Sequence, residues 1–92
     1  MDRYTMNLRS MLTGNRITQF DIRNGRSYSF IVKTVVNNDD GYITIKGDDP
    51  FDTIYLPVSS SEELAVEREC TFRRVYDTSV LEYKIAVCFE EC

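Results

Sequence analysis

One segment, residues 53–69 (TIYLPVSSSEELAVERE), constrains the fold most, because it has the pattern of a strand, an abrupt stop and a helix start. Its first four residues alternate in the period-2 pattern of a strand with one buried face. Pro57 has no amide proton, so it ends this strand or holds it at a sheet edge. Ser60 and Glu63 have the S-x-x-E spacing of a capping box. Together these signals predict a helix over 60–69 that directly follows a strand.

Short runs with strand character lie on both sides of this helix. The expected strands occupy residues 17–23, 27–36, 42–46, 53–56, 70–76 and 80–90, and 53–56 is either a separate strand or a continuation of 42–46. The Asn24-Gly25 pair between the first two is a strong hairpin signal, because a type I′ turn needs positive φ at both central residues. The number and spacing of the strands predict a mainly β protein, an antiparallel sheet closed into a small barrel of five to six strands.

The first residues have the pattern of a short amphipathic helix over 1–12, with Asp2 as its cap and Gly14 at its end. Its apolar stripe consists of Tyr4, Leu8, Met11 and Leu12. Packing of this stripe onto the same domain is favoured over dimerisation, and the segment is also compatible with a terminal arm. We therefore expect an N-terminal helix or arm over 1–14 and one β-barrel domain over 15–92.

Length and composition narrow the class of protein. The chain has 92 residues, of which 42% are hydrophobic, and six tyrosines and five phenylalanines can supply much of one core. There is no apolar run of membrane-spanning length and no secretion signal, so we expect an intracellular protein, nuclear or cytoplasmic, without a membrane partner. The odd number of cysteines, Cys70, Cys88 and Cys92, argues against a disulfide framework. The absence of histidine disfavours a zinc site at the last two.

Charge is distributed unevenly along the chain, whose net charge is −4. Residues 1–33 contain six basic and two acidic residues, whereas residues 34–92 contain five basic and thirteen acidic residues. This balance excludes a strongly basic nucleic-acid binder. It leaves room for a basic patch on an acidic body.

The order of three or four strands, a helix and two more strands resembles the OB-fold, in which a helix joins the third and fourth strands. The segment IYLPVSSSEEL is similar to the Leu-Pro strand end that precedes the helix in small single-stranded-DNA-binding OB domains of viruses and mobile elements. The resemblance covers residues 15–90 and implies binding of single-stranded nucleic acid. The rival architecture is an N-terminal helix wrapped by an antiparallel sheet, as in cystatin-like folds, and the helix at 60–69 fits it less well.

Alternation also sorts the strand residues into two faces. The expected core consists of Phe20, Ile22, Tyr28, Phe30, Val32, Ile43, Ile45, Ile54, Leu56, Leu64, Phe72, Ile85, Val87 and Phe89. The opposite face carries Arg23, Lys33, Tyr42, Lys46, Tyr55, Arg73 and Lys84, and we predict that these seven residues bind nucleic acid, with single-stranded DNA favoured. Bases stack on aromatic rings at about 1–3 kcal/mol each, while lysines and arginines follow the phosphates. Strand propensity and cross-strand packing are the alternative reason for exposed tyrosines.

Catalysis is not expected, because a chain without histidine lacks the usual general base near neutral pH. We predict no catalytic residue, metal or cofactor. The acid pairs Asp39-Asp40 and Asp48-Asp49 suit solvated turns better than calcium loops. The alternative function is a protein-interaction module or viral accessory factor whose acidic surface engages a basic partner. With either function, we expect the small domain to form a homo-oligomer.

Overall fold

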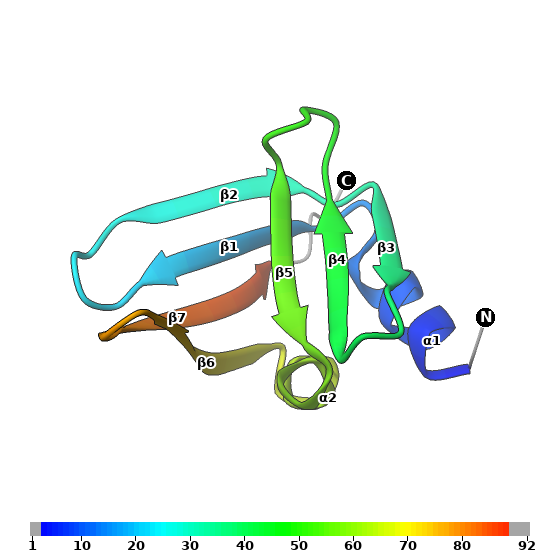
Figure 1. Cartoon of the computed structure of the whole chain (residues 1–92). Coiled ribbons are helices and arrows are strands. Elements are labelled where there is room, and N and C mark those ends of the chain that lie inside the picture. Colours follow the sequence, from blue (N-terminus) through cyan, green and yellow to red (C-terminus); the bar gives the residue numbers. More distant parts are fainter. Residues whose placement is uncertain (1–2, 89–92) are drawn as a thin grey trace.

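The computed structural model of the protein describes residues 3–88, apart from the side chains of Tyr4 and Tyr76. Its elements are α1 (Arg3–Leu12), β1 (Arg16–Asp21), β2 (Ser27–Ile31), β3 (Thr34–Asn37), β4 (Tyr42–Lys46), β5 (Thr53–Pro57), α2 (Val58–Glu67), β6 (Glu69–Tyr76) and β7 (Ser79–Cys88). The strands form a four-stranded sheet in the order β2-β1-β7-β6 and a three-stranded sheet in the order β3-β4-β5, both antiparallel (Figure 1). The predicted mainly β class is confirmed.

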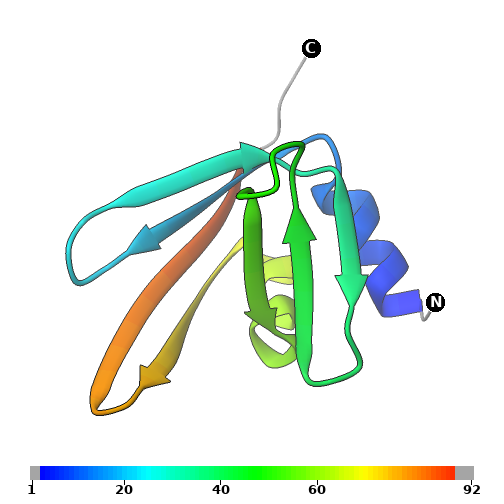
Figure 2. The same cartoon turned by 45° about the horizontal axis from the view of Figure 1, so that its top comes forward.

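The chain passes from one sheet to the other between β2 and β3. The amide of Val32 donates to the carbonyl of Asn15 at 3.0 Å, which extends the pairing of β1 with β2. The next amide, of Lys33, donates to the carbonyl of Lys46 at 2.7 Å, which begins the pairing of β3 with β4. The predicted strand 27–36 is therefore present as two strands separated by a corner. Figure 2 shows how this corner lets the two sheets diverge.

The core lies between the sheets and the two helices. Its buried apolar side chains are Leu8, Leu12, Ile17, Phe30, Val32, Val35, Ile43, Ile45, Ile54, Leu56, Leu64, Cys70, Phe72 and Ile85. Helix α1 contacts β3, and α2 contacts β6, β5 and β4. The guanidinium of Arg9 on α1 also donates to the carbonyl of Val35 at 3.0 Å. The described apolar residues of the stripe, Leu8, Met11 and Leu12, thus pack onto their own domain, the arrangement that the sequence favoured over dimerisation. The predicted cap Asp2 and the side chain of Tyr4 lie outside the described part of the chain.

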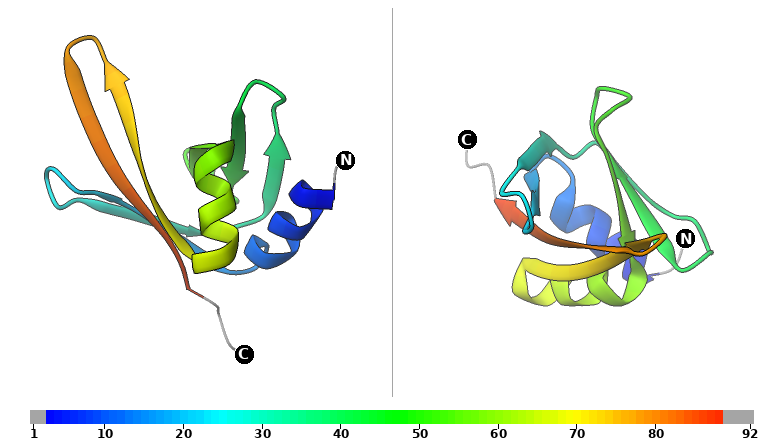
Figure 3. Two further views of the ribbon diagram at one scale, coloured as in Figure 1. Left: turned by 90° about the horizontal axis from the view of Figure 1, so that it is seen from below. Right: turned by 60° about the vertical axis from the view of Figure 1, so that its left-hand side comes forward.

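The two sheets are not closed into a barrel, so the predicted closure is not confirmed. Helix α2 links β5 to β6 at the open side. There, the guanidinium of Arg74 donates to the carbonyl of Tyr55 at 2.8 Å and connects the two sheets. The left view of Figure 3 shows the closed ends of the β1–β2 and β6–β7 hairpins extending past the helices. The OB resemblance therefore stays a prediction.

A hairpin joins β1 to β2 as predicted, but its turn differs from the predicted type. Strand β1 ends at Asp21, whose amide donates to the carbonyl of Arg26 at 2.8 Å and closes a four-residue loop. Gly25 has a φ of 73°, whereas Asn24 is not among the described residues with positive φ. The type I′ prediction, which needs positive φ at both residues, is wrong, because the longer loop needs only one left-handed residue.

Helix α2 begins two residues earlier than predicted, and the capping box is wrong. Pro57 is the N-cap, with φ −58°, and no side chain caps the helix. The amide of Val58 is instead bonded to the carbonyl of Gly41 at 2.9 Å. A neighbouring turn thus satisfies one of the first-turn amides, which have no partner within the helix. The helix ends at Arg68, whose φ is 63°.

Two predicted core residues, Phe20 and Ile22, are exposed. The cause is the register: Ile17 pairs with both Phe30 and Val87, so the odd-numbered residues of β1 face the core. Phe20 therefore faces outward, and so does Ile22, which continues the pairing with β7 one residue past the end of β1. Among the other predicted core positions, Tyr28 and Val87 are partly buried and pack against the core, and Phe89 lies outside the described residues.

Candidate nucleic-acid interface

The outer face of the three-stranded sheet brings together three of the seven predicted site residues. Tyr55 on β5 pairs with Thr44 on β4, and Tyr42 and Lys46 lie two residues to either side of Thr44 on the same face. Val36 on β3 completes the row across the sheet. The tyrosine side chains are exposed, at 43% for Tyr42 and 50% for Tyr55. We call these five residues the tyrosine face.

Two adjoining grooves cross the tyrosine face. One, of about 330 Å³, is lined by Asn38, Asp40, Tyr42, Tyr55 and Arg74. The other, of about 470 Å³, is lined by Val36, Asn38, Thr44, Lys46 and Tyr55. Tyr55 and Asn38 line both, so a ligand extended along the face would contact Tyr55 in either groove. Each groove contains one positively charged side chain, and the first also contains a carboxylate.

The turn between β3 and β4 fixes one end of the tyrosine face. The side-chain amide of Asn38 donates to the hydroxyl of Thr44 at 2.6 Å, and the amide of Tyr42 donates to the carboxylate of Asp40 at 3.0 Å. Asp39 and Gly41 have positive φ, at 60° and 92°. This polar turn therefore holds the backbone at Tyr42 through short-range bonds, which limits the rearrangement that ligand binding would require.

Arg74 belongs to the site and was missed by the sequence reasoning. Its guanidinium bonds to the carbonyl of Tyr55 and lies 5.8 Å from the centre of the Phe72 ring, a cation–π contact. Alternation gave no signal, because Arg74 shares its side of β6 with the buried residues Cys70 and Phe72. The strand continues past the core, so this position reaches the edge of β5 instead. The signal that could have indicated Arg74 is its position: it is a cation on the inward-facing side of the strand, close to the expected strand end.

The other four predicted site residues lie elsewhere. Arg23 is in the β1–β2 turn. On the four-stranded sheet, Arg73 forms an ion pair with Glu82 at 3.1 Å, and Lys84 forms one with Glu69 at 3.3 Å. Alternation distinguishes only inward-facing from outward-facing residues, so it groups these residues with the tyrosines. The structure has two outer faces, and they belong to different sheets. The proposed site is thus smaller than the sequence suggested.

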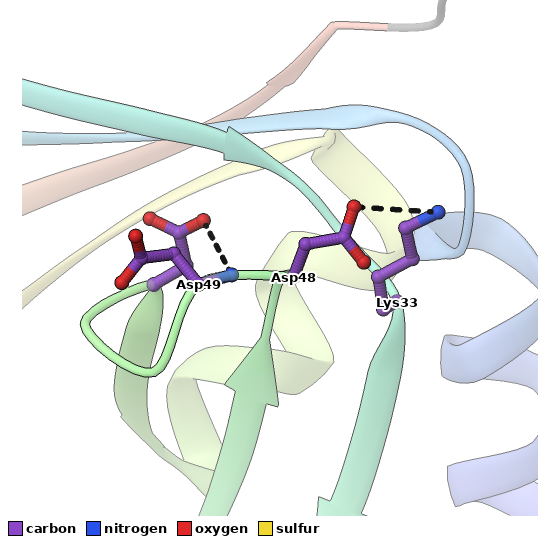
Figure 4. Close-up of polar contacts among 4 residues, drawn as sticks. Lys33, Asp48 and Asp49 are labelled. Atoms are coloured by element: carbon purple, nitrogen blue, oxygen red, sulfur yellow. Dashed lines mark hydrogen bonds and ion pairs between the residues drawn. The ribbon is translucent and has the colours of Figure 1, made fainter.

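Lys33 is directed toward the loop that joins β4 to β5, where its ammonium lies 3.8 Å from the carboxylate of Asp48 (Figure 4). In the same loop the amide of Asp49 donates to the carboxylate of Asp52 at 3.3 Å. The single hydroxyl proton of Tyr28 is shared between the carboxylate of Asp52, whose oxygen is 2.9 Å from the hydroxyl oxygen, and the carbonyl of Phe51. Burial, followed by the bond to Asp52, raises the pKa of Tyr28 to about 12. These contacts explain the acid pair as loop structure. The backbone of Lys33 is next to Lys46, but its side chain is directed to this loop and not to the tyrosine face.

Within residues 3–88, no group of three or more cysteine, aspartate or glutamate side chains is arranged to hold a metal ion. Of the described helices, none is long and apolar enough to cross a membrane. Comparison with protein-family models, curated proteins and solved structures found no match. The candidate site therefore rests on its geometry.

Proposed function

We propose that the protein binds single-stranded nucleic acid on the tyrosine face. The observation that carries this proposal is the placement of two exposed rings, Tyr42 and Tyr55, on neighbouring strands beside Lys46 and Arg74. Rings on a sheet surface offer a stacking platform that is tolerant of sequence, because every base has a π-face. The exposed polar edges of the grooves leave room for the sugar–phosphate chain.

Charge supports binding of moderate strength. The ammonium of Lys46 has no ion pair or hydrogen bond with any other described residue, so it is available to a phosphate. Asp40 offsets part of the positive charge in the neighbouring groove. The net charge of −4 also opposes approach of a polyanion. Affinity should therefore be modest at physiological salt and should rise at low salt.

The test is a fluorescence-anisotropy titration with labelled single-stranded DNA, single-stranded RNA and duplex DNA at several salt concentrations. Tyr42→Ala and Tyr55→Ala should each cost about 1–3 kcal/mol in single-strand affinity. Tyr55→Phe is the matched control, since it keeps the stacking ring and should bind nearly as the wild type does.

Lys46→Ala should reduce the slope of log affinity against log salt by about one unit. Lys84→Ala is its matched control on the other sheet, where the lysine pairs with Glu69, and it should leave the slope unchanged. Absence of single-strand binding by the wild type at low salt would refute the proposed function.

A second candidate function, protein interaction through an acidic surface, is favoured by the β4–β5 loop. Phe51 is 86% exposed and lies between Asp49 and Asp52. Its backbone is fixed by hydrogen bonds within the loop and by one from Tyr28 on β2. Such a loop suits a partner with an apolar pocket and a basic rim. If the wild type fails to bind single strands, this loop becomes the leading candidate site.

A further inference from the structure

The outer face of the four-stranded sheet carries an apolar patch that the core does not use. It consists of Phe20, Ile22, Val75 and Val80, which are 40%, 50%, 67% and 46% exposed. Val75 pairs with Val80, and Phe20 pairs with Lys84. The amide of Ile22 donates to the carbonyl of Glu82 at 3.0 Å, so Ile22 continues the ladder of β1 with β7. Solvated faces of antiparallel sheets are ordinarily polar, so four large apolar side chains here indicate a surface that is covered.

The patch surrounds ion pairs that leave this part of the face neutral. Arg73 pairs with Glu82 at 3.1 Å, and Lys84 pairs with Glu69 at 3.3 Å. The chain as a whole carries a net charge of −4. Two copies of an acidic protein repel each other over most of their surface, and a neutral apolar area is where they can approach. An Arg–Glu pair is also self-complementary, because a two-fold axis can set each cation opposite the partner's anion.

The size of the face limits how strong such an association can be. The four strands have 5, 6, 10 and 8 residues. At about 3.3 Å per residue and about 4.8 Å between strands they cover about 460 Å². Two such faces bury about 900 Å² in total, in the range of weak, transient interfaces. The expected complex is a weak, concentration-dependent dimer.

We propose that the occupant of this face is a second copy of the chain, with the Arg73 and Glu82 charges facing each other across the two-fold axis and the apolar patch packed around them. This goes beyond the proposed function, because the tyrosine face is on the other sheet and stays free in the dimer. The arrangement also gives the expected self-association a surface other than α1, whose Leu8 and Leu12 are buried within their own domain.

The first test is sedimentation velocity on the full chain, from dilute solution up to about 1 mM. The double variant Phe20→Ser, Val80→Thr should raise the dimer Kd at least about tenfold. Phe51→Ser is the matched control, because it removes a more exposed ring from a different surface. It should dimerise as the wild type does. Circular dichroism and the thermal midpoint at dilute concentration report whether each variant is folded.

The second test exchanges charges and does not depend on apolar burial. Glu82→Arg places two guanidinium groups beside each other, and Arg73→Glu places two carboxylates there. Each variant alone should be monomeric where the wild type dimerises, and an equimolar mixture should form a heterodimer. Glu67→Arg makes the same charge change on α2, at an exposed position outside the patch. It should dimerise with itself as the wild type does, and it should not replace Glu82→Arg as the heterodimer partner of Arg73→Glu.

Three outcomes would overturn the proposal: a wild type that stays monomeric at about 1 mM, patch variants that dimerise like the wild type, or a charge-exchanged mixture that does not associate.

Discussion

The outer face of the three-stranded sheet presents two tyrosines and a lysine, whereas that of the four-stranded sheet presents apolar side chains around ion pairs. Their inner faces differ as well. Val35, Ile43, Ile45, Ile54 and Leu56 line the inner face of the three-stranded sheet, and none is more than 1% exposed. On the four-stranded sheet, burial decreases along the strands toward the hairpin ends, which extend past the helices (Figure 3).

The difference shows when alternation can assign a strand's faces. On β4, apolar Ile43 and Ile45 alternate with more polar neighbours, so one face is plainly the buried one. On β1, Ile17 is on one face and Phe20 on the other, so both faces contain an apolar residue. Pairing with β2 and β7 then decides which face is buried. The apolar residue that remains outside becomes part of a surface.

The largest expected effect contrasts an inner with an outer position. Ile45→Ala on β4 should lower the free energy of unfolding by about 2–5 kcal/mol, because the site is fully enclosed. Phe20→Ala on β1 should cost less than about 1 kcal/mol in dilute solution, although it removes a larger side chain. Urea denaturation measures both values. Equal losses would mean that Phe20 belongs to the core and that the two faces of β1 are wrongly assigned.

A second effect is expected where the sheets meet. A Cβ on Gly47, just after β4, would lie 2.8 Å from Cδ2 of Phe30 on β2 and 2.9 Å from Cβ of Asp52. Gly47→Ala should therefore destabilise the fold by about 1–3 kcal/mol through overpacking. The double variant Gly47→Ala, Phe30→Leu should lose less than the sum of the two single variants. Strict additivity in this double-mutant cycle would contradict the close approach.

The turns of the two sheets allow a matched comparison of two glycines. Gly25 in the β1–β2 turn and Gly41 in the β3–β4 turn have φ of 73° and 92°, and a Cβ on either would meet no atom within 4 Å. Valine at either position should cost about 1–2 kcal/mol, because β-branched residues are strained there. Gly41→Val should cost more, since the carbonyl of Gly41 also receives the Val58 amide at 2.9 Å. Thermal midpoints in the reverse order would contradict this difference.

Alkaline pH provides a smaller and reversible perturbation of the inner face of β6. Burial, with Glu63 and Glu69 adding to it, raises the pKa of Cys70 from 9.0 to about 12. Between these values the unfolded thiol loses its proton while the folded thiol keeps it, so stability falls as pH rises. The loss should be about 1.4 kcal/mol at pH 10 and absent well below pH 9. The urea midpoints of the wild type and Cys70→Ser should differ by a constant amount below pH 9. Above pH 9 the midpoint of the wild type should fall relative to that of Cys70→Ser. A difference that stays constant up to pH 11 would refute this role of the thiol.

The smallest effect is expected on α2, between the two sheets. Ser60→Ala should change the free energy of unfolding by less than about 0.5 kcal/mol, because no side chain caps this helix. Ser61→Ala is the contrasting variant, since the buried Ser61 hydroxyl donates to the carbonyl of Val58 at 2.6 Å, and it should cost about 1 kcal/mol. A loss of that size at Ser60 instead would restore the capping box.

The sequence was most informative where signals are local. Strand β4, with its clean alternation, was predicted with its bounds, and the α1 stripe, the Asn24-Gly25 hairpin and the helix after Pro57 were placed close to where they lie. Non-local facts were not accessible. No local pattern marks the corner at Val32, where the chain changes sheets, because both flanking strands are apolar. The same limit applies to the site: alternation placed seven side chains outside, and only tertiary structure separates the tyrosine face from Arg73 and Lys84.

The strand pairing has a consequence for the order in which the chain folds. Four of the five pairings join strands that follow each other in sequence, and each can form as a local hairpin. The pairing of β1 with β7 is the exception, and it matches Ile17 with Val87 across nearly the whole chain. Closing so long a loop costs conformational entropy, and this loss comes before the contacts between β1 and β7 can stabilise the chain. Docking of β7 on β1 should therefore limit the folding rate, so that Ile85→Val slows folding while hairpin variants mainly accelerate unfolding.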